Sequence, residues 1–552
     1  MSARPAPRLR WIALAAMTLA NSMILVDQTA VPLALPDAVL DLGAESSLGQ
    51  WILTANVLPL AAFMVLGGRL GDLLGLKRVF LTGAVIYIVS SALAGAAQSI
   101  EWLIAVRATQ GIGAALMMPT SVAIVAGVFP DAERGRALGL LAGASAFFAA
   151  LGPVVGGALT ELDWRAVFFI NVPLAVVTIV LALVAVPALT RPARTRIDFA
   201  GAVVLAIGLG ALVFGFSQSQ AEGWVRPDVI VPIIVGAIGL VAFLALERRV
   251  HAPLIDLPLF RHLNFTAANV SQTLAGMIEL GMGFVMPYYL LLALELDPAS
   301  AGLALLPATV PIILAGPLAG RAFDKVGGRI PMAVGFLTLA ASGLWLAFTV
   351  GEQDLLLIVP GLILQGIGLG IVLTVNDPVG LSSVPEKERG EAAGVINTSE
   401  QLGGALGIAL LGSLMIGTYR ANLDDIVTRA GETITRTRGE ELKAFLLHSE
   451  QTGLDPDRIP PSLRRLVIEA GDAFLDAFAL TMLATVIIAL LGAAVTFIWV
   501  RRGDPVKEGR IFSRRSRWAY SSTGHGAGLT KRPIPRGPTS APVPASPDSG
   551  GA

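Results

Sequence analysis

Two residues of opposite charge lie inside apolar stretches near the start of the chain, and together they could bind and release a proton. Asp27 lies in the stretch 11–35 and Arg107 in the stretch 101–128. At 1.5 Å per residue, Asp27 lies about 24 Å and Arg107 about 9 Å from the starts of their helices, so both fall in the outer third of a membrane. Charge inside a membrane is costly and usually functional, and a buried acid can exchange its proton near neutral pH. The pair therefore predicts a proton-coupling site, with a purely structural ion pair as the alternative.

Four further polar residues lie in later apolar stretches and are expected to form a substrate cavity: Glu279, Asn376, Asp377 and Glu400. Glu279 and Glu400 lie about 21 Å and about 15 Å into their helices, close to the midplane. Methionines around Glu279 suit an adaptable apolar site, although ordinary packing also explains them. Asn376 and Asp377 could line a vestibule or end a helix in water, and Glu400 could instead pair with a neighbouring helix.

A glycine-rich segment with charged residues follows the second apolar stretch. Its distinctive residues are Gly68, Arg69, Gly71, Asp72, Gly75, Lys77 and Arg78. The glycines permit a tight turn, and Asp72 can face a helix N-terminus while the basic residues offer pairing partners. The segment is expected to be a connecting loop with a gating role, and a loop that only orients the chain is the alternative.

A second cluster of small residues lies in the apolar stretch 137–159. It consists of Gly152, Pro153, Gly156 and Gly157. These residues suit a kinked helix that its neighbours approach closely. The cluster predicts a hinge or seal between two parts of the molecule, with ordinary small-residue packing as the alternative.

The elements that must position these residues are apolar helices. Of the 552 residues, 54% are hydrophobic and 14% are charged, against about 25% charged residues in an average soluble domain. A bilayer core requires about 20 apolar residues per spanning helix. Stretches of this kind lie near 11–35, 51–71, 79–98, 101–128, 137–159, 166–189, 199–218, 228–246, 265–293, 301–322, 331–350, 355–383, 391–417 and 475–500. The sequence therefore predicts an all-α integral membrane protein that spans the bilayer fourteen times.

The connections between these stretches alternate in charge. Every second connection is basic, as at Arg134 and Arg136, and the short connections between them are mainly acidic. Because cytoplasmic loops collect Lys and Arg, both termini are expected in the cytoplasm and the long connection 418–474 outside. Residues 503–552 are rich in Pro, Ser, Gly and Arg and are expected to be a disordered cytoplasmic tail.

The chain contains an internal repeat. The pattern of Gly68–Gly75 recurs 252 residues further on as Gly320–Gly327, and that of Gln110–Gly113 recurs 255 residues further on as Gln365–Gly368. Parallel halves of this kind bind substrate at their interface, near the midplane. The expected organisation is an N-terminal six-helix bundle at 1–190, two additional helices at 191–250, a C-terminal six-helix bundle at 251–502 that includes the connection 418–474, and the tail 503–552.

The motifs together resemble those of a known family. Gly68–Arg78 is similar to the signature loop of the major facilitator superfamily, and the apolar chain from 11 to 500 resembles that superfamily throughout. Leu25–Pro36, Trp164–Pro173 and Pro253–Arg261 resemble segments of the fourteen-span drug:proton antiporters of the EmrB/QacA branch. The resemblance implies two six-helix bundles with two extra central helices.

The same resemblance implies roles for several residues. Gly152–Gly157 is similar to the antiporter motif of exporters, except that Phe148 stands where the longer motif usually has glycine. Arg107 matches the arginine that the family links to proton transfer. The resemblance thus favours a gating role for the small residues and proton coupling for Asp27 with Arg107.

Several functions are disfavoured by what the sequence lacks. There is no cysteine, no nucleotide-binding glycine loop and no zinc-protease motif, and the net charge is zero. Four histidines lie in connections or the tail, where a solvated side chain is the expected state: His251, His262, His448 and His525. We therefore expect no metal, no cofactor, no nucleic-acid partner and no enzymatic activity, with the proton gradient rather than ATP as the energy source.

These observations predict a proton-coupled efflux transporter that exports small lipophilic or cationic compounds, such as drugs or antibiotics, by alternating access. Its expected partners are the small-molecule substrate, protons and the lipid bilayer, and it is expected to act as a monomer in the cell membrane of a bacterium. An uptake symporter and an exporter of a single endogenous metabolite are the alternatives. A channel would not need paired halves, and a membrane enzyme would need a catalytic constellation.

Overall fold

The computed structural model describes residues 7–44, 46–187, 199–222, 226–250, 255, 257–384, 389–431 and 464–501. Residues 1–505 form one compact unit, and the second unit, 506–552, lies outside the described residues. The expected disordered tail therefore lies outside them as well. All regular elements in the described part of the chain are helices, so the all-α prediction is confirmed.

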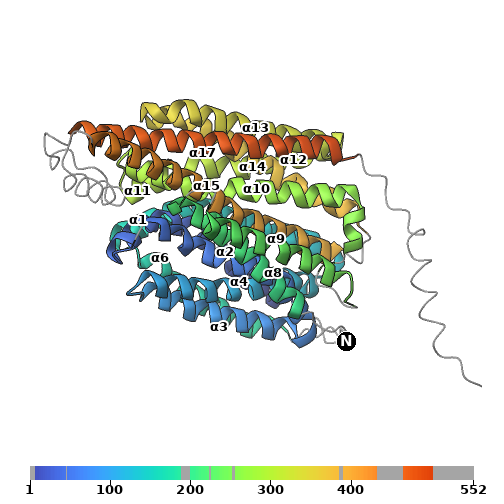
Figure 1. Ribbon diagram of the computed structural model, residues 1–552. Helices are drawn as coiled ribbons and strands as arrows, with labels where there is room; N and C mark the ends of the chain where they lie inside the picture. Colours follow the sequence, from blue (N-terminus) through green and yellow to red (C-terminus); the bar gives the residue numbers. More distant parts are fainter. Residues whose placement is uncertain are drawn as a thin grey trace, which may run out of the picture. The chain divides into compact units, whose positions relative to one another are not determined.

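The first half and the two helices after it run as follows (Figure 1): α1 Pro7–Asp41, α2 Ser46–Leu74, α3 Leu76–Gly95, α4 Ile100–Val128, α5 Asp131–Leu162, α6 Ala166–Phe169, α7 Asn171–Ala185, α8 Phe199–Glu222 and α9 Pro227–Glu247. The second half contains α10 Leu263–Tyr288, α11 Pro298–Ala304, α12 Leu306–Val326, α13 Arg329–Thr349, α14 Leu355–Ser382, α15 Arg389–Gly431 and α17 Arg464–Trp499. Short helical turns lie at Leu257–Arg261, Tyr289–Ala293 and Val350–Glu352.

Thirteen helical segments in the described part of the chain are long and apolar enough to cross a membrane. They coincide with thirteen of the fourteen expected spans. The remaining span corresponds to α8, whose apolar part, Ala200–Phe216, is shorter. Helices α6 and α7 together form one of these segments, and α11 and α12 together form another. When each pair is counted as one span, the spans follow the expected order.

The prediction of a loop between the second and third spans is wrong. Helix α2 continues to Leu74 and α3 begins at Leu76, so Gly75 alone separates them. Gly75 has a φ of +98°, a conformation that glycine adopts without the steric cost that a Cβ would bring. The residues Gly68 to Asp72 therefore lie on the last turns of a helix, and the reversal of direction depends on one glycine.

The expected limits of the long connection 418–474 are also wrong. Helix α15 continues through its first part to Gly431, and α17 already begins at Arg464. Only 432–463 separates the two helices, and it lies outside the described residues. The predicted limits followed the ends of the apolar stretches. Both helices continue beyond those ends with polar residues, so the connection between them is shorter than predicted.

The repeated glycines make the same contact in both halves. A Cβ added at Gly111 on α4 would overlap the backbone carbonyl of Asn56 on α2, and one added at Gly366 on α14 would overlap that of Ala308 on α12. Close approach of helices at small residues is the usual way in which membrane helices pack. The internal repeat thus corresponds to equivalent helix pairs.

The two additional helices contact both halves. Helix α8 packs against α9, against α2 of the first half and against α15 of the second half. Ser413 Oγ on α15 donates a hydrogen bond to the carbonyl oxygen of Phe216 on α8, at 2.6 Å. The pair is therefore attached to both halves rather than to one of them.

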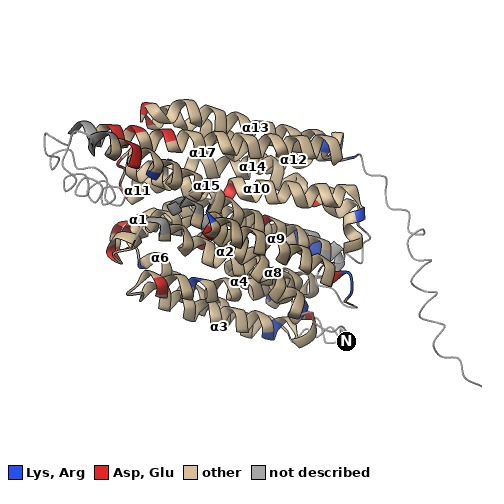
Figure 2. Cartoon of the chain, viewed as in Figure 1, with Lys and Arg blue, Asp and Glu red and all other residues tan. Residues whose placement is uncertain are grey.

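Acidic and basic residues gather at opposite ends of the helices. Figure 2 shows the acidic residues mainly at the end where α1 finishes and the basic residues mainly at the end where the chain begins. At the acidic end, Asp297 accepts a hydrogen bond from the Ser300 backbone N–H at 2.8 Å and caps α11. Hydrogen bonding by the Ser300 side chain, and secondly by its backbone N–H, holds the pKa of the Asp297 carboxyl below its usual value. By the positive-inside rule, the basic end is expected to face the cytoplasm.

Candidate functional site

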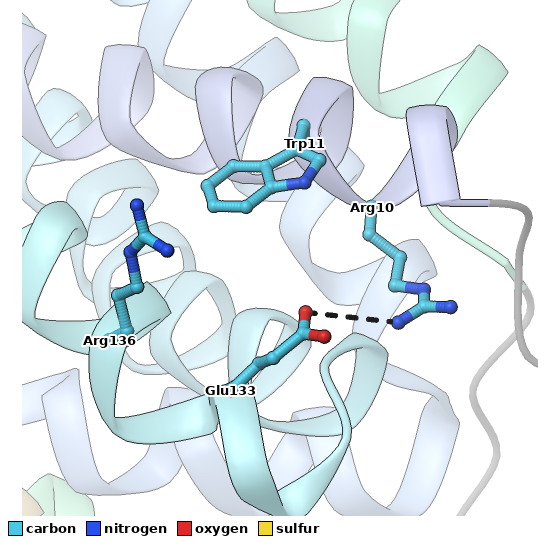
Figure 3. A pocket seen from close by; sticks show the side chains of 4 residues that line it. All are labelled: Arg10, Trp11, Glu133 and Arg136. Atoms are coloured by element: carbon cyan, nitrogen blue, oxygen red, sulfur yellow. Dashed lines mark ion pairs between the residues drawn. The ribbon is translucent and has the colours of Figure 1, made fainter.

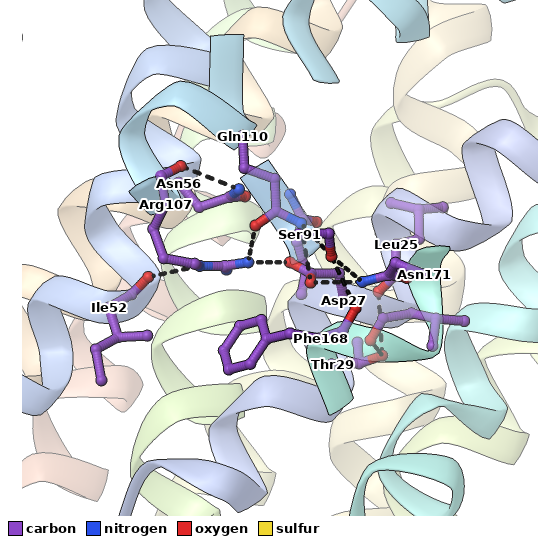
Figure 4. A network of polar contacts seen from close by, with 12 residues as sticks. Leu25, Asp27, Thr29, Ile52, Asn56, Ser91, Arg107, Gln110, Phe168 and Asn171 are labelled. Atoms are coloured by element: carbon purple, nitrogen blue, oxygen red, sulfur yellow. Dashed lines mark hydrogen bonds and ion pairs between the residues drawn. The ribbon is translucent and has the colours of Figure 1, made fainter. Parts of the chain in front are cut away.

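Asp27 and Arg107 form a buried ion pair between α1 and α4. Arg107 Nη1 lies 2.5 Å from Asp27 Oδ2, and the two side chains are 0% and 1% exposed. The guanidinium is held further by hydrogen bonds from Nε to the Ile52 carbonyl oxygen, at 2.9 Å, and from Nη1 to Gln110 Oε1, at 2.7 Å. The structure thus brings together the two residues that sequence reasoning paired, as Figure 4 shows.

The second oxygen of Asp27 is also hydrogen-bonded. Asn171 Nδ2 donates to Asp27 Oδ1 at 3.2 Å, and Gln110 Nε2 donates to the same oxygen at 3.5 Å (Figure 4). Ser91 Oγ accepts from both amides and donates to the Phe168 carbonyl oxygen. Donors on both oxygens stabilise the ionised carboxylate.

Sequence reasoning had not placed Asn171 in this site. The residue lies at the start of α7 and is 1% exposed. In the sequence, the only indication of a role for this residue is that it is a single amide in an apolar stretch. The segment around it was used only for the family resemblance. An uncharged polar residue in a membrane helix usually has a partner, but the partner depends on how the helices are rotated.

A cavity of about 250 Å³ lies between the two halves, and its wall is mostly apolar. It is lined by residues of α1, α5, α10, α12, α14 and α15. Glu279 and Glu400 both line it, together with Met282 and Met286. Asp27 is not among the lining residues, so the ion pair and the cavity are separate sites.

Glu400 is connected to polar residues behind the cavity wall. Gln272 Nε2 on α10 donates to Glu400 Oε2, and Gln272 Oε1 accepts from Asn376 Nδ2 on α14. Asn376 is 0% exposed, bonds to Ser271 and donates to the Ala268 carbonyl oxygen. Asn376 therefore supports Glu400 from behind rather than lining the cavity as expected.

Asp377 is half-buried and does not belong to the cavity wall either. It follows Asn376 on α14, where an adjacent residue points about 100° away around the helix. The structure therefore places two of the four expected cavity residues, Glu279 and Glu400, in the cavity.

The small residues of α5 make close contacts across the molecule. A Cβ added at Gly152 would overlap Thr29 on α1, and one added at Gly157 would overlap the Pro298 carbonyl of α11. Gly302 of α11 lies equally close to the Pro153 carbonyl. Because α11 belongs to the second half, this end of α5 joins the two halves near the acidic end of the helices.

The glycine-rich end of α2 packs against α4. A Cβ added at Gly71 would lie 2.8 Å from Thr120 Cγ2, whereas one added at Gly68 would lie 3.6 Å from the Pro119 side chain. Beyond the turn, Lys77 Nζ donates to the Leu183 carbonyl oxygen at the end of α7, at 2.8 Å. The segment therefore joins α2, α3, α4 and α7 at the basic end, which suits a gating role.

A second pocket, of about 330 Å³, lies at the basic end between α1 and α5. Figure 3 shows its four lining residues, Arg10, Trp11, Glu133 and Arg136. Arg10 Nη1 and Glu133 Oε2 lie 4.0 Å apart, and the Arg136 guanidinium lies 6.0 Å from the centre of the Trp11 ring. Its side chains are partly exposed, so this pocket is a surface feature.

Comparison with known proteins gives concordant results. Residues 17–408 match the family model described as Major Facilitator Superfamily. The chain is 33% identical over 534 residues to the probable actinorhodin transporter of Streptomyces coelicolor, covering 90% of this chain and 92% of that protein. It is 30% identical to the tetracenomycin C resistance and export protein of Streptomyces glaucescens, covering 91% and 94%.

Two further similarities concern drug resistance and fold. The multidrug resistance protein Stp of Mycobacterium tuberculosis is 30% identical, covering 77% of this chain and 79% of that protein. The crystal structure of a bacterial homologue of the human lysosomal transporter Spinster has a TM-score of 0.61 at 18% identity, covering 91% of this chain and 100% of that one. The latter likeness concerns the fold alone.

Proposed function

The chain belongs to the Major Facilitator Superfamily, and we propose that it exports small lipophilic or cationic compounds in exchange for protons. It is an efflux transporter of a bacterial membrane, in keeping with its relatives. The observation that carries the proposal is the separation of two sites. A buried ion pair suited to a proton lies inside the first half, and an apolar cavity with two carboxyl groups lies between the halves.

The proton is proposed to act on Asp27. In the state described here, its carboxyl group lies 2.5 Å from the Arg107 guanidinium. Protonation removes the charge that holds the guanidinium, so the hydrogen bonds of α1, α4 and α7 around Asp27 rearrange. A ligand can shift an equilibrium between two conformations only through different interactions with each, and the proton meets this condition.

The substrate is proposed to bind in the cavity. Its apolar wall suits a lipophilic compound, and Glu279 with Glu400 favours a positive charge on that compound. Two methionines, Met282 and Met286, offer adaptable contacts. The relatives include one protein named for multidrug resistance and one named for multidrug efflux, which supports a broad substrate range.

A narrower substrate range is the second candidate. Several relatives are named for one natural product, such as actinorhodin, tetracenomycin C or cephamycin. Under this reading the cavity takes one compound that the producing cell makes. In both cases we infer that the proton gradient supplies the energy, without ATP, a cofactor or an enzymatic step.

Transport into everted membrane vesicles tests the proposal. A host without its own efflux pumps, with and without this protein, is exposed to a panel of dyes and antibiotics, and the compounds it tolerates better are then assayed in vesicles. Uptake into everted vesicles should require a pH gradient, acid inside, and should stop when a protonophore dissipates it. Uptake that persists without the gradient, or that requires ATP, would refute proton coupling.

A further inference from the structure

Three consecutive residues of α1 contact three different parts of the molecule. Asp27 faces the ion pair inside the first half, and Thr29 Oγ1 donates to the Ala149 carbonyl oxygen of α5 at 3.0 Å (Figure 4). Gln28, between them, lines the cavity, as does Thr29. Successive residues of a helix point about 100° apart, so a small rotation of α1 changes all three contacts together.

The side chain of Gln28 contacts the other half directly. Its Nε2 donates to Gln401 Oε1 on α15 at 3.0 Å, and the two side chains are only 6% and 4% exposed. These residues are 373 positions apart in the chain. The hydrogen bond therefore joins α1, which carries Asp27, to α15, which carries Glu400.

On the α15 side the polar contacts continue into the second half. Glu400 adjoins Gln401 and accepts from Gln272 of α10, which in turn accepts from Asn376 of α14. If α15 moves at Gln401, the Glu400 carboxyl therefore moves relative to the amides of Gln272 and Asn376, which lie on α10 and α14. A path therefore leads from Asp27 along the α1 backbone to Gln28, through the Gln28–Gln401 hydrogen bond, and along the α15 backbone to Glu400 in the cavity.

We propose that Gln28 and Gln401 are the positioning residues that couple the Asp27–Arg107 pair to the carboxyl groups of the cavity. This inference rests on the proposed function, because it assumes that Asp27 exchanges protons and that the cavity binds the substrate. Protonation of Asp27 allows α1 to rotate, and the rotation breaks the Gln28–Gln401 hydrogen bond. Substrate binding beside Glu400 acts in the reverse direction, since coupling between two binding sites is reciprocal.

Two amides suit this task because they carry no charge. Their hydrogen bond is made or broken without placing an unpaired ion in the membrane, which would be costly. The net contribution of such a hydrogen bond is small and is comparable with the coupling free energies found between binding sites in other proteins. The link therefore biases a conformational equilibrium without locking it.

The titratable groups on either side of the link are few in the described residues. Arg107 of α4 faces Asp27, and the hydroxyl of Tyr87 on α3 interacts with the pair electrostatically. Around Glu400 the interacting acids are Glu279 of α10 and Asp377 of α14. These groups are retained in the variants below, so a changed pH response can be assigned to the link.

The test compares wild type with Gln28→Leu, Gln401→Leu and the double variant, using ethidium as a lipophilic cation. Purified protein in weakly buffered solution reports the protons released on binding, and the dissociation constant is measured at several pH values. Gln365→Leu is the matched control. Gln365 lines the same cavity and is 8% exposed, but its Oε1 has no hydrogen-bond partner among the described residues.

In wild type, exchange of one proton makes the affinity change by up to about 10-fold per pH unit. Gln28→Leu and Gln401→Leu should each reduce this dependence to less than about 2-fold and release few protons, while still binding ethidium at high pH. The double variant should be no worse than either single variant, because both remove the same bond. Gln365→Leu should change the affinity by the same factor at every pH and keep the wild-type proton release, because Gln365 lines the cavity but takes no part in the Gln28–Gln401 hydrogen bond.

Variants that release as many protons as wild type would overturn the coupling role of the two glutamines, as would an equal loss in Gln365→Leu. Wild type that releases no proton would instead overturn the proposed function, and the inference with it.

A second measurement does not depend on the leucine variants. The chain has no cysteine, so Gln28→Cys with Gln401→Cys can be bridged by a bifunctional thiosulfonate. Bridging should stop export, and reduction should restore it; export that continues across the bridge would contradict the inference.

Discussion

At the scale of single residues, Asp27 is the group whose chemistry is most specific. Both carboxylate oxygens accept hydrogen bonds from buried donors, and the facing guanidinium lies 2.5 Å away. Asp27→Asn keeps the size of the side chain but cannot release a proton at any accessible pH. The variant should lose gradient-driven export while ethidium binding to purified protein survives within a few-fold. Export against a gradient at the wild-type rate would show that another acid couples the proton.

Asn171 provides a companion test at the same site. Asn171→Ala removes the donor to Asp27 Oδ1, and loss of a hydrogen bond to a charged group costs about 1.5–3 kcal/mol. Asp27 then lacks one of its donors, so gradient-driven export should fall, and purified protein should release fewer protons on binding ethidium. Ser90→Ala is a control, because Ser90 bonds to Thr109 rather than to Asp27. Export and proton release at the wild-type level in Asn171→Ala would remove the residue from the proton site.

Glu279 should behave differently from Asp27, because it lines the cavity. If it recognises the charge of a cationic substrate, Glu279→Gln should weaken cationic compounds by about 1–3 kcal/mol, the range for a lost charge-assisted contact. Neutral compounds should be nearly unaffected. Binding of one cationic and one neutral compound to purified protein measures the difference. Equal weakening of both would indicate a packing role.

The residue scale also shows how far sequence reasoning reaches. The Asp27–Arg107 pairing follows from depth in the membrane, which depends only on the helical rise. The bonds from Asn171 to Asp27 and from Gln28 to Gln401 depend in addition on helix rotation and on how the two halves meet. Asn376 was placed at a plausible depth but lies behind the cavity for the same reason. A single sequence fixes depth well and rotation poorly.

At the scale of elements, α5 differs between its two ends. Gly157, near the acidic end, lies against the Pro298 carbonyl of α11, whereas a Cβ at Gly143 would meet nothing within 4 Å. Gly157→Ala should push α5 and α11 apart, with overpacking costs of about 1–3 kcal/mol. Because the contact joins the two halves, the variant should favour the state that is open at the acidic end and should slow export. Gly143→Ala, on the same helix, should export at the wild-type rate.

Equal export rates for the two alanine variants, at equal amounts of protein in the membrane, would contradict a sealing role for this end of α5. The comparison separates sealing from helix propensity, since both changes replace glycine by alanine inside one helix. It also bears on the span 5 motif, whose gating role came from family resemblance. The small residues alone predicted close approach of a neighbouring helix, and the contacts of Gly152 and Gly157 identify the neighbours as Thr29 of α1 and Pro298 of α11.

The turn between α2 and α3 illustrates the opposite limitation. A glycine-rich segment favours a loop by composition, yet only Gly75 has a positive φ, and Gly68 and Gly71 lie on a helix. At Gly71 the missing Cβ allows α4 to approach, and the glycines of the motif therefore serve two purposes. Composition cannot distinguish a glycine that turns the chain from one that admits a neighbouring helix.

At the scale of the whole molecule, the close contacts between α5 and the second half lie at the acidic end. Gly157 and Gly302 make close contacts between α5 and α11, whereas a Cβ added at Gly139 or Gly143, nearer the basic end of α5, would meet nothing within 4 Å. Gly139, Gly143 and the cavity-lining Ala150 share one face of α5, at helical spacings. We expect the cavity to be reached from the basic end, which the positive-inside rule places in the cytoplasm, because an exporter collects its substrate there.

Alternating access predicts that the two ends respond oppositely to the proton gradient. The chain has no cysteine, so Gly143→Cys at the basic end and Ala299→Cys in the α5–α11 contact can each be labelled alone with a membrane-impermeant maleimide. Without substrate or gradient, Gly143→Cys should react in everted vesicles and Ala299→Cys should be protected in right-side-out vesicles. With substrate and a gradient that is acid on the extracytoplasmic side, which is the inside of everted and the outside of right-side-out vesicles, the reactivity of Gly143→Cys should fall and that of Ala299→Cys should rise. One rocking motion closes the first site as it opens the second. Asp27→Asn should abolish this gradient response in both positions. Reactivities that rise or fall together would contradict alternating access, and labelling of Gly143→Cys only in right-side-out vesicles would reverse the orientation inferred from the basic connections.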